Sequence, residues 1–183
     1  MNFATRAELD AALPGILAAP KDGAEIGALC LRPERNTRRF VDRIEVTREQ
    51  GIPGERWLRE PWLRLPDGTP HPGIQVCILS RRVLDLVWRD RETVVHPGDT
   101  FIVDMDLGMD NLPEGTLLQA GCAVLRVSGV FNDACVKWKA RYGAASKDWI
   151  NAPENHRHRL RGILCSVESD GAIHNGNRLL KQG

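Results

Sequence analysis

Residues 117–130 read LLQAGCAVLRVSGV and contain two apolar segments on either side of Gly121. Branched apolar residues interrupted by a glycine are typical of short β-strands joined by a turn. We therefore expect strands at Leu117 and Leu118 and over residues 123–130. The preceding segment, residues 101–107, places apolar residues at every second position, a period of two that predicts another strand.

Similar patterns recur on both sides of this region. They predict strands over residues 25–30, 43–47, 74–79 and 160–167. The dipeptide Asp170-Gly171 favours a two-residue hairpin turn, so we expect the residues after it to pair back onto the strand at 160–167.

Short helices accompany these strands. Thr5 and Glu8 have the spacing of a capping box, which predicts a helix over residues 5–13 that ends before Pro14. Ser80 is a typical N-cap residue and predicts a second helix directly after it. With about seven or eight short strands against two or three short helices, the chain is predicted to be mainly β, a barrel of short, mostly antiparallel strands.

Size and charge restrict the classes of function. The 183 residues, with a mass of 20.4 kDa, correspond to one domain with a short extension. The 25 lysines and arginines nearly balance the 24 aspartates and glutamates, which argues against nucleic acid as a partner, because proteins that bind it usually carry a basic excess. No apolar run reaches the roughly 18 residues of a membrane span, and the N-terminus does not resemble a secretory signal, so we expect a cytoplasmic protein with no membrane partner.

The five cysteines are an odd number without a Cys-x-x-Cys pair, which argues against a disulfide framework or a four-cysteine zinc site. Four of them lie in or beside apolar strand segments, where core packing is the expected role: Cys30, Cys77, Cys122 and Cys165. Cys135 differs, because it follows the turn-like triplet Asn132-Asp133-Ala134 and precedes a segment suited to a helical turn. Backbone N–H groups and cations at such a junction favour the thiolate, the form that binds metals and carries sulfur.

Positive charge is concentrated in residues 131–162, where seven lysines and arginines face three acidic residues, a net of 7 − 3 = +4. Lys137 and Arg141 lie four residues apart, so on a helix they would share one face near Cys135. Arg161 precedes a glycine that either admits a ligand close to the backbone or marks a bulge. Such a segment suits a small anion such as phosphate, although charge alone is explained more simply by solvated faces of a helix and a strand edge.

A series of short motifs keeps the order and spacing of a known family. The matching segments are residues 51–57, 98–107, 111–116, 121–127, 135–138, 141–143, 151–153, 159–163 and 171–173. Together they resemble the MOSC domain, which is named for the C-terminal part of molybdenum-cofactor sulfurases. The resemblance implies a MOSC-type β-barrel domain over residues 23–183, preceded by an N-terminal helical extension over residues 1–22.

The resemblance also implies a chemistry centred on Cys135. In the family, the central cysteine either ligates molybdenum in the pterin cofactor or carries sulfur as a persulfide, and some members reduce N-hydroxylated compounds. The family is also associated with pyridoxal phosphate. The expected partners are a phosphate-bearing small molecule or cofactor and a sulfur donor or redox partner protein. The other residues expected to bind the cofactor are Lys137, Arg141, Arg161, Gly54, Glu55 and Arg56.

Four places differ from the family pattern. Glu55 replaces the usual aspartate, Thr100-Phe101 replaces an acidic–asparagine pair, and Gly176-Asn177 replaces Gly-Asp. Asn132 and Ala134 replace the histidine and glycine of closer relatives. Two hypotheses follow: a molybdenum-dependent oxidoreductase or sulfur-transfer protein, or a non-catalytic β-barrel binding module that has lost the cofactor.

Overall fold

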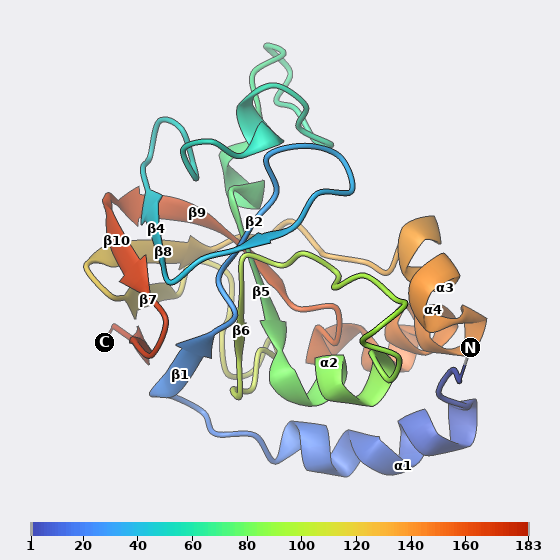
Figure 1. Ribbon diagram of the computed structural model, residues 1–183. Coiled ribbons are helices and arrows are strands. Elements are labelled where there is room, and N and C mark those ends of the chain that lie inside the picture. Colours follow the sequence, from blue (N-terminus) through green and yellow to red (C-terminus); the bar gives the residue numbers. More distant parts are fainter. Residues whose placement is uncertain (1, 183) are drawn as a thin grey trace.

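The computed structural model describes residues 2–182, which form a closed barrel of seven strands with helices on one side (Figure 1). Around the barrel the strands are β1 (Ala24–Gly27), β11 (Arg178–Lys181), β7 (Leu117–Ala120), β8 (Ala123–Val127), β9 (Ile163–Ser169), β5 (Val76–Ser80) and β6 (Phe101–Val103). Within the described residues, β5–β6 is the one parallel pair of the barrel. The predicted mainly β fold, a barrel of short and mostly antiparallel strands, is confirmed.

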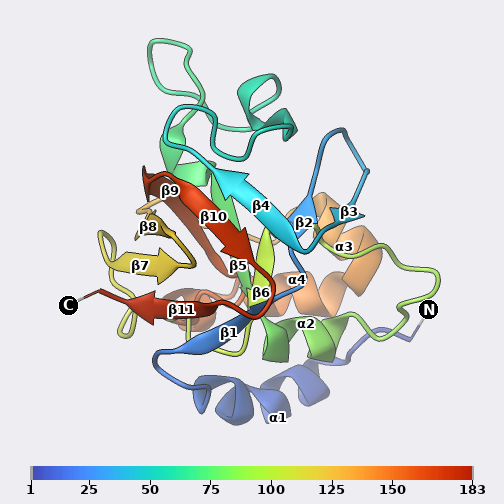
Figure 2. The ribbon, with the colours of Figure 1, turned by 60° about the vertical axis from the view of Figure 1, so that its left-hand side comes forward.

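Two short ribbons flank the barrel (Figure 2). One pairs β4 (Arg43–Val46) with β10 (Gly171–His174), and the other pairs β2 (Cys30–Leu31) with β3 (Arg39–Phe40). Ile44 and Ile173 of the first ribbon are directly opposed and belong to the apolar cluster that fills the barrel. The ribbon therefore adds to the core rather than standing apart from it.

Four α-helices gather beside the barrel: α1 (Arg6–Leu17), α2 (Arg81–Val87), α3 (Val136–Tyr142) and α4 (Ala144–Ile150). They share a second apolar cluster that includes Leu9, Val83 and Trp149. Within the described residues there are also three 3-10 helices, η1 (Arg56–Leu58), η2 (Pro72–Ile74) and η3 (Pro153–His158). Over residues 2–182, none of the helices has both the length and the apolar character that a bilayer crossing requires.

Strands β5 and β9 carry apolar residues on both faces, and this positions the site described below. Ile78 of β5 lies in the barrel cluster, whereas its neighbour Cys77 belongs to a third cluster with Trp57 and Leu164. Successive side chains of a strand point to opposite faces, so this third cluster covers the outside of the barrel. Cys77 and Leu164 are opposed across the β5–β9 pair.

Several predicted strands are shorter than expected. Those predicted over residues 101–107 and 123–130 end at Val103 and Val127, and two others are shortened because the backbone turns. The segment 25–30 is divided between β1 and β2, since Ala28 adopts a φ of 54°, a left-handed conformation that a regular strand does not contain. The strand predicted over residues 160–167 begins only at Ile163, after positive φ angles of 46° at Arg159 and 89° at Gly162.

The predicted hairpin at Asp170-Gly171 is wrong. After this turn the chain leaves the barrel, and β10 pairs with β4 instead of β9. Asp170 Oδ1 accepts a hydrogen bond from the Arg48 N–H at 2.8 Å, which ties the turn to the end of β4. The burial of Ile44 against Ile173 selects this distant partner, and a rule based on the local turn does not contain that contact.

The N-terminal helix is longer than predicted. It begins with the predicted capping box of Thr5 and Glu8, but it continues through Pro14. Leu9 and Ile16, on either side of the proline, are both buried. Burial of each such side chain contributes about 1.5–3 kcal/mol, which offsets the roughly 3 kcal/mol cost of a proline inside a helix. Packing therefore extends the helix across a residue that would end it in isolation.

Candidate functional site

A cavity of about 420 Å³ lies over the outer face of the β5–β9 pair. Its walls come from the β2–β3 connection, from η1 and the loop after it, and from the segment that leads into α3. A volume of this size accommodates a small organic ligand. Six cationic residues and one acidic residue border it: Arg32, Arg38, Arg56, Lys137, Arg141 and Arg161, against Asp133.

A more open depression of about 580 Å³ lies beside the turn between β9 and β10. Its charged border consists of one cation, Arg48, and three carboxylates, those of Glu49, Glu168 and Asp170, and it contains no cysteine. The combination of a thiol and cations that the sequence predicts is therefore found in the 420 Å³ cavity.

Cys135 borders the cavity, is exposed, and occupies the N-cap position of α3. The peptide before it is held by Asn151, whose Oδ1 accepts from the Ala134 N–H at 2.8 Å and whose Nδ2 donates to the Ala134 carbonyl at 2.9 Å. Ala134 itself is buried. The thiol is therefore both accessible and carried on a fixed backbone.

Helix α3 places two basic side chains beside this thiol. Trp138 and Tyr142 bury one side of the helix, and Trp138 Nε1 donates to the Ser146 hydroxyl at 2.8 Å. Lys137 and Arg141 both border the cavity, in agreement with their four-residue spacing.

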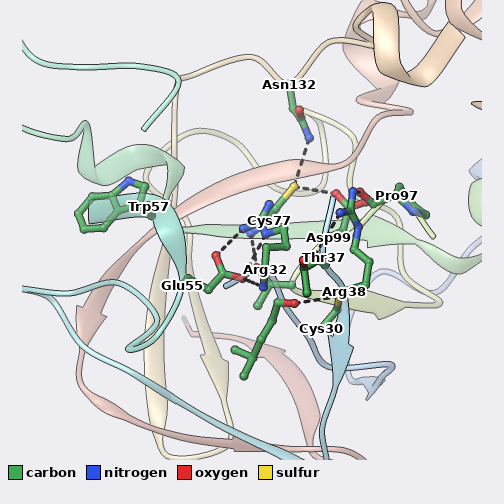
Figure 3. Close-up of polar contacts among 12 residues, drawn as sticks. Cys30, Arg32, Thr37, Arg38, Glu55, Trp57, Cys77, Pro97, Asp99 and Asn132 are labelled. Carbon is green, nitrogen blue, oxygen red and sulfur yellow. Dashed lines mark hydrogen bonds and ion pairs between the residues drawn. The ribbon is translucent and has the colours of Figure 1, made fainter. Parts of the chain in front are cut away.

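The wall on the β2 side is built on an ion pair between the half-buried Arg32 and the buried Glu55 (Figure 3). Glu55 Oε1 accepts from the Arg32 backbone N–H at 2.9 Å and from Nε at 3.1 Å, and Oε2 accepts from Nη2 at 2.9 Å. Burial lowers the pKa of Arg32, but the Glu55 carboxylate outweighs this effect and leaves that pKa raised. Arg32 is therefore a fixed, neutralised cation.

The floor of the cavity is a hydrogen-bonded cluster of four side chains. Asp99 Oδ1 accepts from the Cys77 thiol at 2.7 Å and from Arg161 Nη1 at 2.7 Å. Asn132 Nδ2 donates to Cys77 Sγ at 3.5 Å (Figure 3). It also donates to the Arg161 carbonyl at 3.0 Å. The other oxygen of Asp99, Oδ2, is buried and has no partner within residues 2–182.

The charges in this floor determine which groups hold protons. Burial raises the pKa of Asp99, but the Arg161 guanidinium, the hydrogen bond from the Cys77 thiol and the charge of Arg32 together leave the pKa of that carboxyl below its usual value. Burial and then the Asp99 carboxylate raise the pKa of the Cys77 thiol far above its ordinary range. Burial lowers the pKa of Arg161, but Asp99 and, to a smaller extent, the Cys77 and Cys135 sulfurs raise it overall. The floor thus contains a carboxylate, a guanidinium and a protonated thiol.

Three of the six cations at the cavity are neutralised and three are not. The pairs are Arg32 with Glu55, Arg161 with Asp99 and, at 3.8 Å, Arg56 with Glu60, a carboxylate that also pairs with Arg35 at 2.7 Å. In the described part of the chain, no carboxylate lies within 4 Å of the other three, Arg38, Lys137 and Arg141. With Asp133 included, the cavity and its carboxylate partners carry a net charge of 6 − 4 = +2.

The excess of positive charge at the cavity affects the pKa of Arg38. Its Nε donates to the His96 carbonyl at 3.1 Å and its Nη2 to the Pro97 carbonyl at 2.9 Å, so its position is fixed although its charge is not balanced. Burial, followed by repulsion from Arg141, lowers the pKa of Arg38. An anion between these groups would relieve that repulsion.

Sequence reasoning located part of this site. Of the predicted residues, Cys135, Lys137, Arg141, Arg161 and Arg56 border the cavity. Glu55 lies behind the wall and acts through Arg32, whereas Gly54 does not border the cavity and forms a turn with a φ of 86°. The other lysines and arginines of residues 131–162 do not border the cavity. Arg157 pairs with Asp110, and Arg159 donates to the Leu112 carbonyl.

Arg32, Arg38 and Asp99 were missed as site residues, and Cys77 was expected only to pack. A signal existed for the arginines, because residues 31–39 contain four arginines against one glutamate. No pattern near Cys77 indicates its bond to Asp99. Cys30 and Cys165 are buried as expected, but the prediction for Cys122 is wrong, since this cysteine is exposed in the turn between β7 and β8.

Comparisons with known proteins agree on the fold. No protein-family model and no curated protein sequence matches the chain. Among solved structures, the YuaD protein from Bacillus subtilis is similar, with 20% identity and a TM-score of 0.58 over 86% of this chain and 94% of that one. YiiM from Escherichia coli has 17% identity and a TM-score of 0.58, over 88% of this chain and 70% of that one. YiiM from Geobacillus stearothermophilus has 15% identity and a TM-score of 0.58, over 87% and 75%. The closed seven-stranded barrel and these likenesses fit a MOSC-like fold.

Proposed function

We propose that the cavity binds the phosphate-bearing pterin molybdenum cofactor, with the Cys135 sulfur as the protein ligand to molybdenum. The observation that carries this proposal is the set of three unneutralised cations beside an exposed thiol. Arg38, Lys137 and Arg141 border the same cavity as Cys135 and lack carboxylate partners within residues 2–182.

The cations suit the phosphate. Charge-assisted hydrogen bonds from Arg and Lys to phosphate oxygens are stronger than neutral ones. Arg38 is already held by backbone carbonyls, so it loses little side-chain freedom when an anion binds. Lys137 and Arg141 extend from one helix and can reach the same group.

The thiol suits the metal. Soft thiolate ligands are preferred by soft metal centres, and Cys135 is exposed on a backbone fixed by Asn151. Cys77 borders the same cavity but keeps its proton, because burial and Asp99 raise the pKa of its thiol. Cys77 therefore does not compete as a ligand. When bound, the cofactor supplies oxygen-atom and electron transfer at molybdenum.

A second candidate function uses the same sulfur as a persulfide carrier. The accessibility of Cys135 favours it, since the neighbouring Val136 is 75% exposed and leaves room for a sulfur donor protein. The association with pyridoxal phosphate that the resemblance implies enters here only through its phosphate, which the same three cations would hold.

The test combines two measurements on purified protein. After incubation with the pterin cofactor, bound molybdenum is measured by plasma mass spectrometry, and after incubation with a persulfide donor, the modified cysteine is mapped by peptide mass spectrometry. Cys122→Ala is a matched control, because Cys122 is the other exposed cysteine in the described residues.

Loss of molybdenum in Cys135→Ala but not in Cys122→Ala supports the proposal. A persulfide on Cys135 without retained molybdenum favours the second candidate. If Cys135→Ala binds the phosphate-bearing ligand as well as the unchanged protein and neither metal nor persulfide is found, the protein is a binding module and the thiol has no role.

A further inference from the structure

Trp62 is an aromatic side chain without a structural partner. It is 64% exposed, whereas Trp57, Trp138 and Trp149 are buried and Trp88 is half-buried. Among residues 2–182, its ring stacks on no other aromatic ring or cation, and its indole N–H donates to no acceptor. Packing therefore does not explain a tryptophan at this position.

The position of Trp62 is nevertheless fixed. It precedes Leu63, which packs against the cluster on the outer face of the barrel. The Leu63 carbonyl accepts from the His71 N–H at 3.1 Å, and Arg64 forms a bridge with Pro70. The loop that carries the Trp62 ring is thus attached to the core by the residues directly after Trp62.

Trp62 borders the cavity that holds Cys135. Other apolar residues border it as well, among them Ile74, Leu164 and the largely exposed Val136. The cavity therefore combines an excess of cations with an apolar border that includes an unpartnered aromatic ring. Such a surface matches a ligand that has an anionic group at one end and a flat ring at the other, because flat rings stack favourably on indole.

We propose that Trp62 is a specificity residue that stacks on the planar ring of the ligand and so distinguishes a ring-bearing phosphate from an aliphatic phosphate. The inference rests on the proposed function for its anion site, held by Arg38, Lys137 and Arg141. It adds the ring as a second recognition element and assigns that element to one residue.

The test compares two probes by titration calorimetry: 6-hydroxymethylpterin phosphate, which has a ring, and glycerol 3-phosphate, which does not. Trp62→Ala should weaken binding of the pterin phosphate about tenfold, the lower end of what stacking on an aromatic side chain contributes, and leave glycerol 3-phosphate unchanged. Trp62→Phe should recover most of the loss. Leu58→Ala is the control, because Leu58 is also an exposed apolar residue, at the end of η1, but does not border the cavity.

The two proposals fail in different ways. If the unchanged protein binds both probes equally, or if Trp62→Ala weakens both probes to the same extent, the role of Trp62 is overturned while the anion site remains. If the unchanged protein binds neither probe, the proposed function is overturned, and the role of Trp62 with it. Thermal melting of each variant verifies the fold, which the loss of an exposed side chain should leave intact.

Discussion

Asp99→Asn removes one charge from the buried pair in the floor of the cavity and keeps the shape of the side chain. Asp99 is fully buried, and its partner Arg161 is 15% exposed. Removing one partner of a buried ion pair costs about 3–5 kcal/mol, because the other charge stays buried without compensation. The Cys77 thiol and Arg161 can still donate to the amide oxygen, so we expect a loss near the lower end of this range.

The assay is equilibrium unfolding in urea, with thermal melting as a second measurement. For a chain of this size, 1 kcal/mol shifts the melting temperature by about 2–4 °C, so Asp99→Asn should lower it by about 6–12 °C. Glu45→Gln is the control, since it removes one partner of the exposed Arg43–Glu45 pair. A pair of that kind contributes about 1 kcal/mol or less.

The pH dependence provides an independent check. The folded-state pKa of Asp99 lies below its ordinary value, so its ionisation stabilises the protein fully above about pH 4. This stabilisation is lost as the pH falls through the lower, folded-state pKa. The difference between the unchanged protein and Asp99→Asn should therefore be constant above about pH 5 and shrink in acid. A loss no larger than that of Glu45→Gln, or an identical acid dependence in both proteins, would refute the reasoning about this pair.

Three further predictions address other parts of the molecule. Burial lowers the pKa of His96 to about 4. The stability that neutral His96 contributes should therefore be complete above about pH 6.5 and fall as the pH decreases toward 4. Urea unfolding of His96→Gln should show less of this pH dependence, and an unaltered pH dependence would contradict the prediction. Iodoacetamide should label the exposed Cys122 and Cys135 in the folded protein, as measured by peptide mass spectrometry. The buried Cys30, Cys77 and Cys165 should react only after unfolding. Burial also raises the pKa of Cys30 to about 11 and that of Cys165 to about 12, which disfavours the reactive thiolate. Phosphate binding, measured by calorimetry, should weaken about tenfold in Lys137→Gln and in Arg141→Gln. Lys139→Gln is the control and should not weaken it, because Lys139 lies on the same helix but outside the cavity. Equal effects of all three substitutions would indicate a diffuse positive surface potential instead of a binding site.

Local patterns predicted much of the barrel. Alternating or continuous apolar segments located the barrel strands β7, β8 and β9 and the flanking strand β4, because backbone geometry places successive side chains on opposite faces and requires those toward the core to be apolar. The segment after Cys135, judged suited to a helical turn, forms helix α3. On this helix the four-residue spacing of Lys137 and Arg141 brings both residues to the cavity. Local rules were wrong where a distant contact outweighed them, as at Pro14, where burial of Leu9 and Ile16 continues the helix, and after Asp170, where β10 pairs with β4.

The amino-acid pattern alone therefore established a small, mainly β chain and singled out Cys135 among five cysteines, because both depend on residues that are neighbours along the chain. The surroundings of that sulfur depend on contacts between distant segments. Arg38 comes from the connection before β3, and Cys77, Asp99 and Arg161 meet on the outer face of the barrel. Closure of the barrel brings these charges together. The periodicity of apolar residues along the chain does not indicate which side chains of distant segments meet.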